Sequence, residues 1–236
     1  MRTYRSEIRL IQLGVLIAAL VVISGLISPS LWGKGQNVAD KGSKEGQTAV
    51  TEEKAPLNAA NQKIVALGDS FTFGYPGTED KSWPKRLGDK LGTTVVNKGK
   101  IQQTTKDLLD RFDQDVVTED PGIVIIFGGN GDALNGVPLE TFQENIQALV
   151  EKAKSNHITP VLALPLPYKS VQEDIRNMRK WETEYAETAK IRVLDFSTVL
   201  MNVEGIYLEG LSGDDGKYPT AKGYEKMGDY AANILK

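Results

Sequence analysis

The fold of this chain is constrained most by five short apolar runs that alternate with helical patterns. The runs lie at 63–67, 93–96, 122–127, 160–164 and 191–196. Each is largely continuous in apolar residues, which is typical of strands buried on both faces of a parallel sheet. Between them, apolar residues recur at helical spacing in three stripes: Phe142, Ile146, Leu149 and Ala153; Ile175, Met178, Trp181 and Tyr185; Tyr224, Met227, Ala231 and Ile234. This alternation predicts a three-layer α/β/α sandwich over 63–236, with a five-stranded parallel sheet and right-handed crossovers.

The segment before this domain has a different character. Residues 10–32 are almost wholly apolar and follow Arg2, Arg5 and Arg9. Their length is close to the roughly 20 residues that cross a bilayer, and arginines favour the cytoplasmic side. We therefore expect 1–32 to hold a single-pass signal-anchor, with the domain outside the cytoplasm; the alternative is a cleaved signal peptide and a secreted protein. Residues 33–62 lack aromatic residues and are expected to form a flexible linker.

Composition excludes several function classes. The formal net charge is −3, so no basic surface indicates a nucleic-acid partner. The chain has no cysteine, which excludes disulfides, thiolate metal sites and a cysteine nucleophile. It has one histidine, His157. No pattern predicts a metal or an organic cofactor, and we expect a monomeric domain.

Polar loops follow the predicted strands, and ligands of parallel α/β sheets bind at the carboxyl ends of strands. Ser70 comes directly after the first strand, where the amides of a helix start can stabilise an oxyanion; it is either a nucleophile or a simple helix cap. Asn130 follows the third strand in a glycine-rich loop, as an oxyanion donor or a turn residue. Asp215 precedes the last helix and either orients a base or caps that helix.

Several blocks in this order resemble the SGNH or GDSL hydrolases, in their lysophospholipase and thioesterase branch. They are ALGDSFTFGYPG at 66–77, VVNKGKIQQTTKDLLDR at 95–111, FGGNGDALNGVPLETFQENI at 127–146 and DDGKYPTAKGYEKMGDYAANIL at 214–235. The resemblance implies a flavodoxin-like sandwich. It also implies hydrolysis of an acyl or carbohydrate ester through an acyl-serine, without metal or cofactor.

The same resemblance implies a role for individual residues. Ser70 corresponds to the nucleophile and Asp215 to the triad acid. The oxyanion hole would take its donors from Ser70, Gln102 and Asn130. Three neighbouring residues would support these groups: Gly68, Asp69 and Gly129.

The chain departs from the family pattern at three positions. Tyr218 stands where the family has its catalytic histidine, Gln102 stands where it has a glycine, and Gly131 is an apparent insertion. A tyrosine of ordinary pKa, about 10, is only about 0.1% ionised at neutral pH and is not competent as the general base. If position 102 requires a positive φ, glutamine adds strain of about 1 kcal/mol there.

No other residue replaces the histidine convincingly. His157 precedes the fourth strand and is expected about 15–20 Å of sheet away from the site. Lys217 adjoins Tyr218 but should point in another direction, and Lys222 lies on the closing helix. Three hypotheses follow: a tethered serine esterase, an inactive relative that binds a lipid, acyl or glycan ligand in the same cleft, and a nucleotide or phosphate binder. The third fits least, because the first loop lacks a phosphate cradle.

Overall fold

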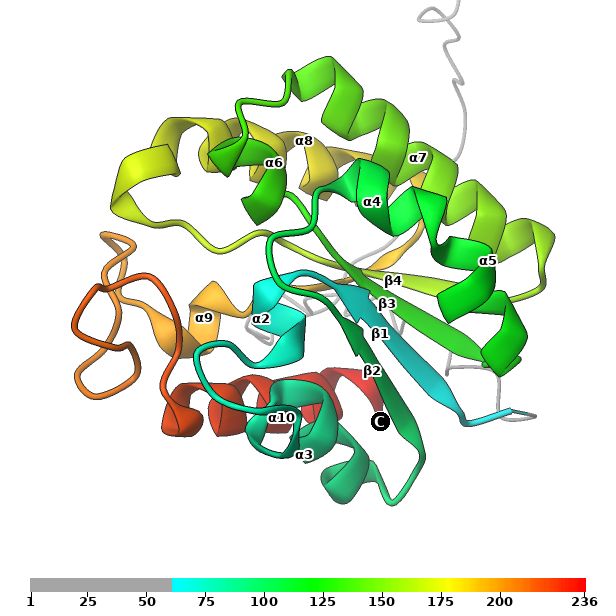
Figure 1. The fold of residues 1–236 in the computed structure, drawn as a ribbon, viewed down its shortest axis with the longest axis horizontal. Coiled ribbons are helices and arrows are strands. Elements are labelled where there is room, and N and C mark those ends of the chain that lie inside the picture. The colour runs from blue at the N-terminus through cyan, green and yellow to red at the C-terminus, as the bar shows by residue number, and fades with distance from the viewer. Residues whose placement is uncertain (1–60) are drawn as a thin grey trace, which may run out of the picture. The chain divides into compact units, whose positions relative to one another are not determined.

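Five parallel strands in the order β2-β1-β3-β4-β5 form the middle layer of the structure (Figure 1). The structure is a computed structural model, and it describes residues 61–236. The strands are β1 (Ile64–Gly68), β2 (Val95–Gly99), β3 (Ile123–Phe127), β4 (Thr159–Ala163) and β5 (Arg192–Leu194). The predicted three-layer fold and its five-stranded parallel sheet are therefore confirmed.

The predicted anchor at 10–32 and nearly all of the predicted linker lie outside the described residues. Within 61–236, no helix combines the length and the apolar character needed to cross a membrane.

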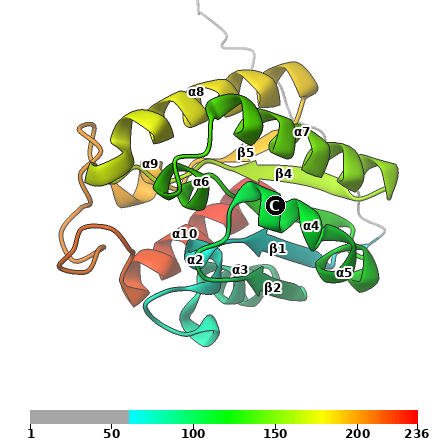
Figure 2. The same ribbon diagram turned by 45° about the horizontal axis from the view of Figure 1, so that its top comes forward.

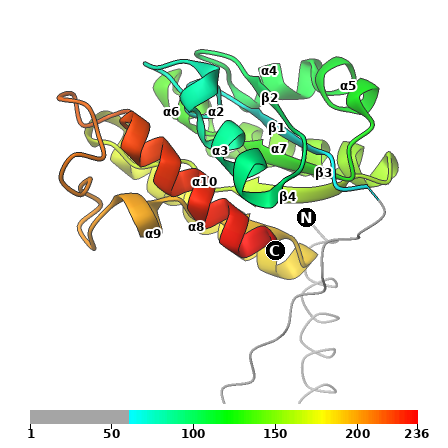
Figure 3. The ribbon, with the colours of Figure 1, turned by 90° about the horizontal axis from the view of Figure 1, so that it is seen from below.

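Helices cover both faces of the sheet, as Figure 2 shows from a second direction. One face carries α4 (Thr105–Asp110), α5 (Phe112–Asp115), α7 (Leu139–Ser155) and α8 (Gln172–Ala189). The other carries α3 (Trp83–Leu91) and α10 (Ala221–Leu235), which lie side by side in Figures 1 and 3. The remaining short elements are α2 (Ser70–Phe73), α6 (Asn130–Leu134), α9 (Ser197–Leu200) and the 3-10 turns Glu79–Lys81, Val117–Glu119 and Lys169–Val171.

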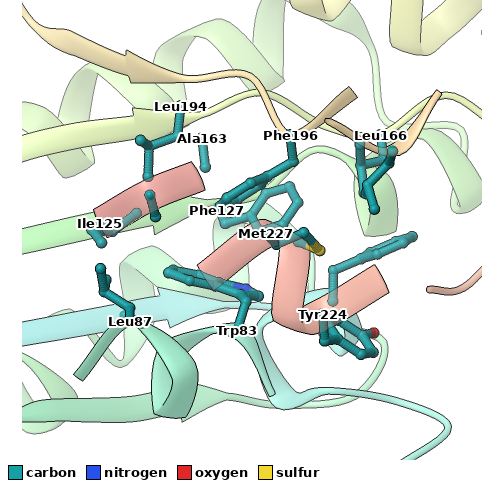
Figure 4. Packing of buried hydrophobic residues seen from close by; sticks show 14 of the residues in the cluster. Trp83, Leu87, Ile125, Phe127, Ala163, Leu166, Leu194, Phe196, Tyr224 and Met227 are labelled. Carbon is teal, nitrogen blue, oxygen red and sulfur yellow. The ribbon is translucent and has the colours of Figure 1, made fainter. Parts of the chain in front are cut away.

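Successive strand residues point to opposite faces, so the sheet separates two cores. In β3, Ile125 and Phe127 pack toward α3 and α10, whereas Val124 and Ile126 pack toward α7 and α8. Figure 4 shows the first core, where Trp83 from α3 and Met227 from α10 lie close to Phe127. Burying each such large side chain contributes about 1.5–3 kcal/mol, so both helices are held by their apolar stripes.

Two predicted stripes need correction at their ends. On α10 the side chain of Ile234 is exposed, and Leu235 is buried in its place. On α8 Trp181 and Tyr185 are only half-buried, whereas the intervening Glu182 is fully buried. Among the described residues neither oxygen of that carboxyl has a hydrogen-bond partner, and burial raises its pKa well above the usual value.

The carboxyl end of β2 approaches α2 very closely at Gly99. A Cβ atom placed there would lie 2.1 Å from the backbone nitrogen of Phe73. We predict that Gly99→Ala lowers the free energy of unfolding by about 1–3 kcal/mol, because overpacking forces the two segments apart. Urea denaturation measures this, with Gly213→Ala as control, since its new methyl would have no neighbour closer than 3.6 Å. Equal stability of the two variants would contradict the prediction.

Candidate active site

Ser70 lies at the point where β1 ends and α2 begins. Asp69 is the N-cap of α2, and its carboxylate accepts a hydrogen bond of 2.9 Å from the Phe71 N–H. The turn is tight: a Cβ at Gly68 would lie 2.1 Å from the hydroxyl oxygen of Thr72. As a result Ser70 is the first residue of the helix, with only 5% of its surface exposed.

The backbone N–H of Gln102 donates a hydrogen bond of 3.0 Å to the Ser70 hydroxyl oxygen. Gln102 has a φ of 62°. Position 102 therefore does have the positive φ that the sequence analysis considered. A non-glycine residue in this region costs about 1 kcal/mol. The loop after β2 therefore keeps a strained residue in a conformation that aims its amide at the serine.

Asn130 is fixed by its neighbour Leu166 from the segment after β4. Its Nδ2 donates to the Leu166 carbonyl at 2.7 Å, and its Oδ1 accepts from the Leu166 N–H at 3.1 Å. This pairing leaves one Nδ2 hydrogen uncommitted, as an oxyanion donor would need. Gly129, directly before it, is the N-cap of α6 and has a φ of 102°.

The apparent insertion Gly131 lies where two site loops touch. A Cβ there would lie 2.0 Å from the carbonyl oxygen of Gln103, so only glycine fits. Asp132, which follows, accepts hydrogen bonds from the Thr105 N–H at 2.9 Å and from its hydroxyl at 2.6 Å. Gly131 and Asp132 thus hold the loops after β2 and β3 together.

Arg111 also contributes to the geometry of the site, although the family resemblance assigned it no role. Its guanidinium donates to the last carbonyl of β1, at Gly68, and to the Lys98 carbonyl in β2, each at 2.9 Å. It forms an ion pair with Asp115 and is 9% exposed. Arg111 therefore joins the strand ends that carry Ser70 and Gln102. The sequence signal was weak, because an arginine at a helix end usually faces solvent.

The aromatic ring of Tyr218 packs against the segment that follows Ser70. The ring centroid is 5.1 Å from that of Phe71 and 4.8 Å from that of Tyr75. Asp215 is exposed, and its carboxylate accepts a hydrogen bond of 3.0 Å from the Lys217 N–H. Among the described residues no hydrogen bond links the Tyr218 hydroxyl to Ser70 or Asp215. The three groups share a region without forming a connected relay.

Of the three other basic candidates, His157 and Lys222 lie away from Ser70 as predicted, whereas the prediction for Lys217 was wrong. His157 is exposed between α7 and β4, at the opposite end of the strands from Ser70. Lys222 is exposed in the first turn of α10. The ammonium of Lys217, by contrast, points toward the site: it lies 4.9 Å from the ring centroid of Tyr218 and 5.0 Å from that of Tyr168.

Sequence reasoning missed Tyr168. Only 8% of its surface is exposed, and its buried hydroxyl has no hydrogen-bond partner in the part of the chain that the structure describes. Burial, together with Tyr218 and Asp69, raises its pKa above the usual range, so the phenol is neutral. Its segment carries no motif, so the sequence offered no signal. Within 61–236, no group of three or more metal-binding side chains is present.

Comparison with known proteins agrees with this geometry. Residues 66–226 match the model of the GDSL-like lipase/acylhydrolase family. The chain is 32% identical to an arylesterase of Vibrio mimicus, covering 75% of this chain and 89% of the relative. It is 26% identical to thioesterase 1/protease 1/lysophospholipase L1 of Escherichia coli K12, covering 75% and 85%. A solved G-D-S-L lipolytic-family protein from Desulfitobacterium hafniense DCB-2 is 58% identical, with a TM-score of 0.73 and coverage of 74% and 100%.

Asp69 makes stability depend on pH in a defined window. Burial raises its pKa from 3.8 to about 7, and the Asp132 carboxylate adds to the shift. A folded pKa above the unfolded one gives stability that is complete below about pH 4 and is lost as pH rises through 7. Asp69→Asn keeps a capping side chain but cannot ionise. We predict that its free energy of unfolding exceeds that of wild type by about 1–4 kcal/mol between pH 4 and 8.

Chemical denaturation at several pH values measures this difference. The exposed Asp214→Asn variant controls for simple loss of a carboxylate. If the difference in the free energy of unfolding between Asp69→Asn and wild type shrinks as pH rises, the raised pKa of Asp69 is contradicted.

Proposed function

Because this chain belongs to the GDSL-like lipase/acylhydrolase family, we propose that it hydrolyses small acyl or carbohydrate esters through an acyl-enzyme at Ser70. The relatives' names (arylesterase, thioesterase/lysophospholipase, acetylxylan esterase) support ester substrates of this class. No metal or organic cofactor enters the proposed reaction.

The observation that carries the proposal is a hydrogen bond at Ser70, the first residue of α2. The backbone nitrogen of Gln102 lies 3.0 Å from the Ser70 hydroxyl oxygen and donates to it. After attack on an ester carbonyl, the Gln102 and Ser70 amides and the free Nδ2–H of Asn130 would stabilise the oxyanion. Donors of this kind are effective because they are fixed before the negative charge develops. Each lowers the free energy of the transition state by about 3–4 kcal/mol. The strain at Gln102 and the pairing of Asn130 with Leu166 provide this fixation.

Proton transfer is the weak point of the proposed reaction. Tyr218 stands at the position of the family's base, and a neutral phenol does not accept the serine proton at neutral pH. In a serine protease, removing the triad histidine costs about 10⁶ in turnover. We therefore propose slow hydrolysis that relies on the oxyanion donors and on water or hydroxide as the proton acceptor.

A serine-directed fluorophosphonate tests the nucleophile. We predict slow labelling of wild type and none of Ser70→Ala, because the reaction requires the hydroxyl. Mass spectrometry of the labelled peptide locates the adduct. Labelling that persists in Ser70→Ala would show that another residue reacts and would contradict the assignment.

The base position is tested by Tyr218→His. We predict that kcat/KM for p-nitrophenyl acyl esters rises by about 10² or more, because general-base catalysis contributes about 10²–10⁴. Tyr218→Phe is the matched control, since it keeps the ring packing against Phe71 and Tyr75 but adds no base. A folded but inert Tyr218→His would mean that position 218 does not face the serine or that the oxyanion hole is not competent.

The second candidate function is ligand binding without turnover. It is favoured by the exposed Asp215, whose carboxylate accepts from the Lys217 N–H while no hydrogen bond joins it to Tyr218 within 61–236. In this case the same cleft would hold a lipid, acyl or glycan ligand. Absence of both labelling and turnover in wild type, with retained ligand binding, would favour it.

We also propose that residues 10–32 anchor the domain, as a monomer, on the outer side of the cytoplasmic membrane. The apolar stretch and the preceding arginines support this orientation. Protease treatment of intact cells tests it: the domain should be cleaved outside, while release into the medium in a shorter form would indicate a cleaved signal peptide.

A further inference from the structure

A cavity of about 780 Å³ opens beside the candidate active site. It lies between the segment that leads from β4 into α8 and the segment that leads from α9 into α10, which are neighbours in Figures 1 and 2. Its walls include six side chains: Pro167, Tyr168, Lys169, Ile206, Tyr207 and Lys217. Asp215 also borders it, so the cavity is continuous with the loop that carries Tyr218.

Within 61–236 neither lysine of this cavity forms an ion pair, although the Asp215 carboxylate also borders it. The Lys217 ammonium lies over the rings of Tyr168 and Tyr218, and the neighbouring Asp215 carboxylate accepts from the Lys217 backbone N–H instead. Lys169 is exposed and forms no ion pair with any described residue. A cation held by aromatic faces keeps its charge and its N–H donors available to an anion.

Most of the remaining wall is apolar, although Ser170, Ser212 and Asp215 also line it. The rim next to Tyr207 continues the apolar character. The Tyr207 hydroxyl donates a hydrogen bond of 3.2 Å to the Lys217 carbonyl. This bond holds the ring of Tyr207 next to the residue that carries the positive charge. Beyond it, Ile206 is 59% and Leu208 45% exposed. A charged end and an adjoining apolar surface are complementary to a molecule with one charged head and one chain.

We propose that this cavity binds a single-chain anionic amphiphile. Its carboxylate or phosphate lies at Lys217 and Lys169, and its chain lies along Pro167, Ile206 and Tyr207. The binding does not require turnover at Ser70; that such an amphiphile is the ester substrate rests on the proposed function.

Calorimetric titration with n-decyl phosphate, below its micelle concentration, tests the proposal. We expect binding that weakens at high salt and that is at least 10-fold weaker in Lys217→Met, which keeps the length of the side chain but removes its charge. Lys169→Met should weaken binding as well, and it serves as a second variant if Lys217→Met does not fold. Lys154→Met, at the opposite end of the strands, is the matched control and should bind like wild type.

Two further ligands make the test decisive. The neutral n-decyl maltoside and inorganic phosphate should each bind at least 10-fold more weakly than n-decyl phosphate. Equal binding of the maltoside, equal binding of inorganic phosphate, or an unchanged affinity in both lysine variants would overturn the proposal.

The same titration distinguishes the anionic binding site from the proposed ester hydrolysis. If n-decyl phosphate binds through Lys217 in a protein that neither reacts with fluorophosphonate nor cleaves esters, the binding site stands and the hydrolase fails. If esters are cleaved but n-decyl phosphate does not bind, the hydrolase stands and the anionic site fails.

Discussion

The geometry of the site depends on how closely β1 and β2 approach at their carboxyl ends. Gly99 allows the backbone of β2 to touch α2, and Arg111 binds the last carbonyl of β1 together with the Lys98 carbonyl in β2. Only with this closeness does the Gln102 amide reach the Ser70 hydroxyl. The strain of a positive φ at Gln102 is then held by the packing of both strands rather than by the loop itself.

Hydrogen bonds order the half of the candidate site around Ser70, whereas within 61–236 no hydrogen bond joins Asp215 or the Tyr218 hydroxyl to it. Ser70 and Asn130 are buried, and hydrogen bonds fix Ser70 to the exposed Gln102 and Asn130 to Leu166. Asp215 and Tyr218 belong to a loop that is exposed or half-buried. The Tyr218 ring packs on Phe71 and Tyr75, and its carbonyl accepts a hydrogen bond from the Gly213 N–H. Oxyanion stabilisation survives such a division because it needs only fixed donors, whereas proton transfer needs a continuous hydrogen-bonded path.

The sequence predicted the sheet, its parallel direction and the convergence of the loops, because buried parallel strands and amphipathic helices carry strong periodic signals. It placed Ser70 and Gln102 together through motif order. It missed Arg111 and Tyr168, whose roles depend on contacts between distant segments. Glu182 was missed for a similar reason: a charged residue within an apolar stripe is assigned to the surface, yet its place on α8 turns it fully inward.

Lys217 and Tyr218 are best understood as a pair. In a serine hydrolase the base becomes cationic as the serine attacks, and a second cation close to it disfavours that charge. The Lys217 ammonium is half-exposed and lies 4.9 Å from the Tyr218 ring centroid, a separation at which two unit charges repel by about 1 kcal/mol in water. A neutral tyrosine avoids this cost and instead offers its ring face to the lysine. On the proposed assignment, a tyrosine at position 218 weakens proton transfer but is compatible with a positive charge at the adjoining cavity, where an anionic ligand would gain from it.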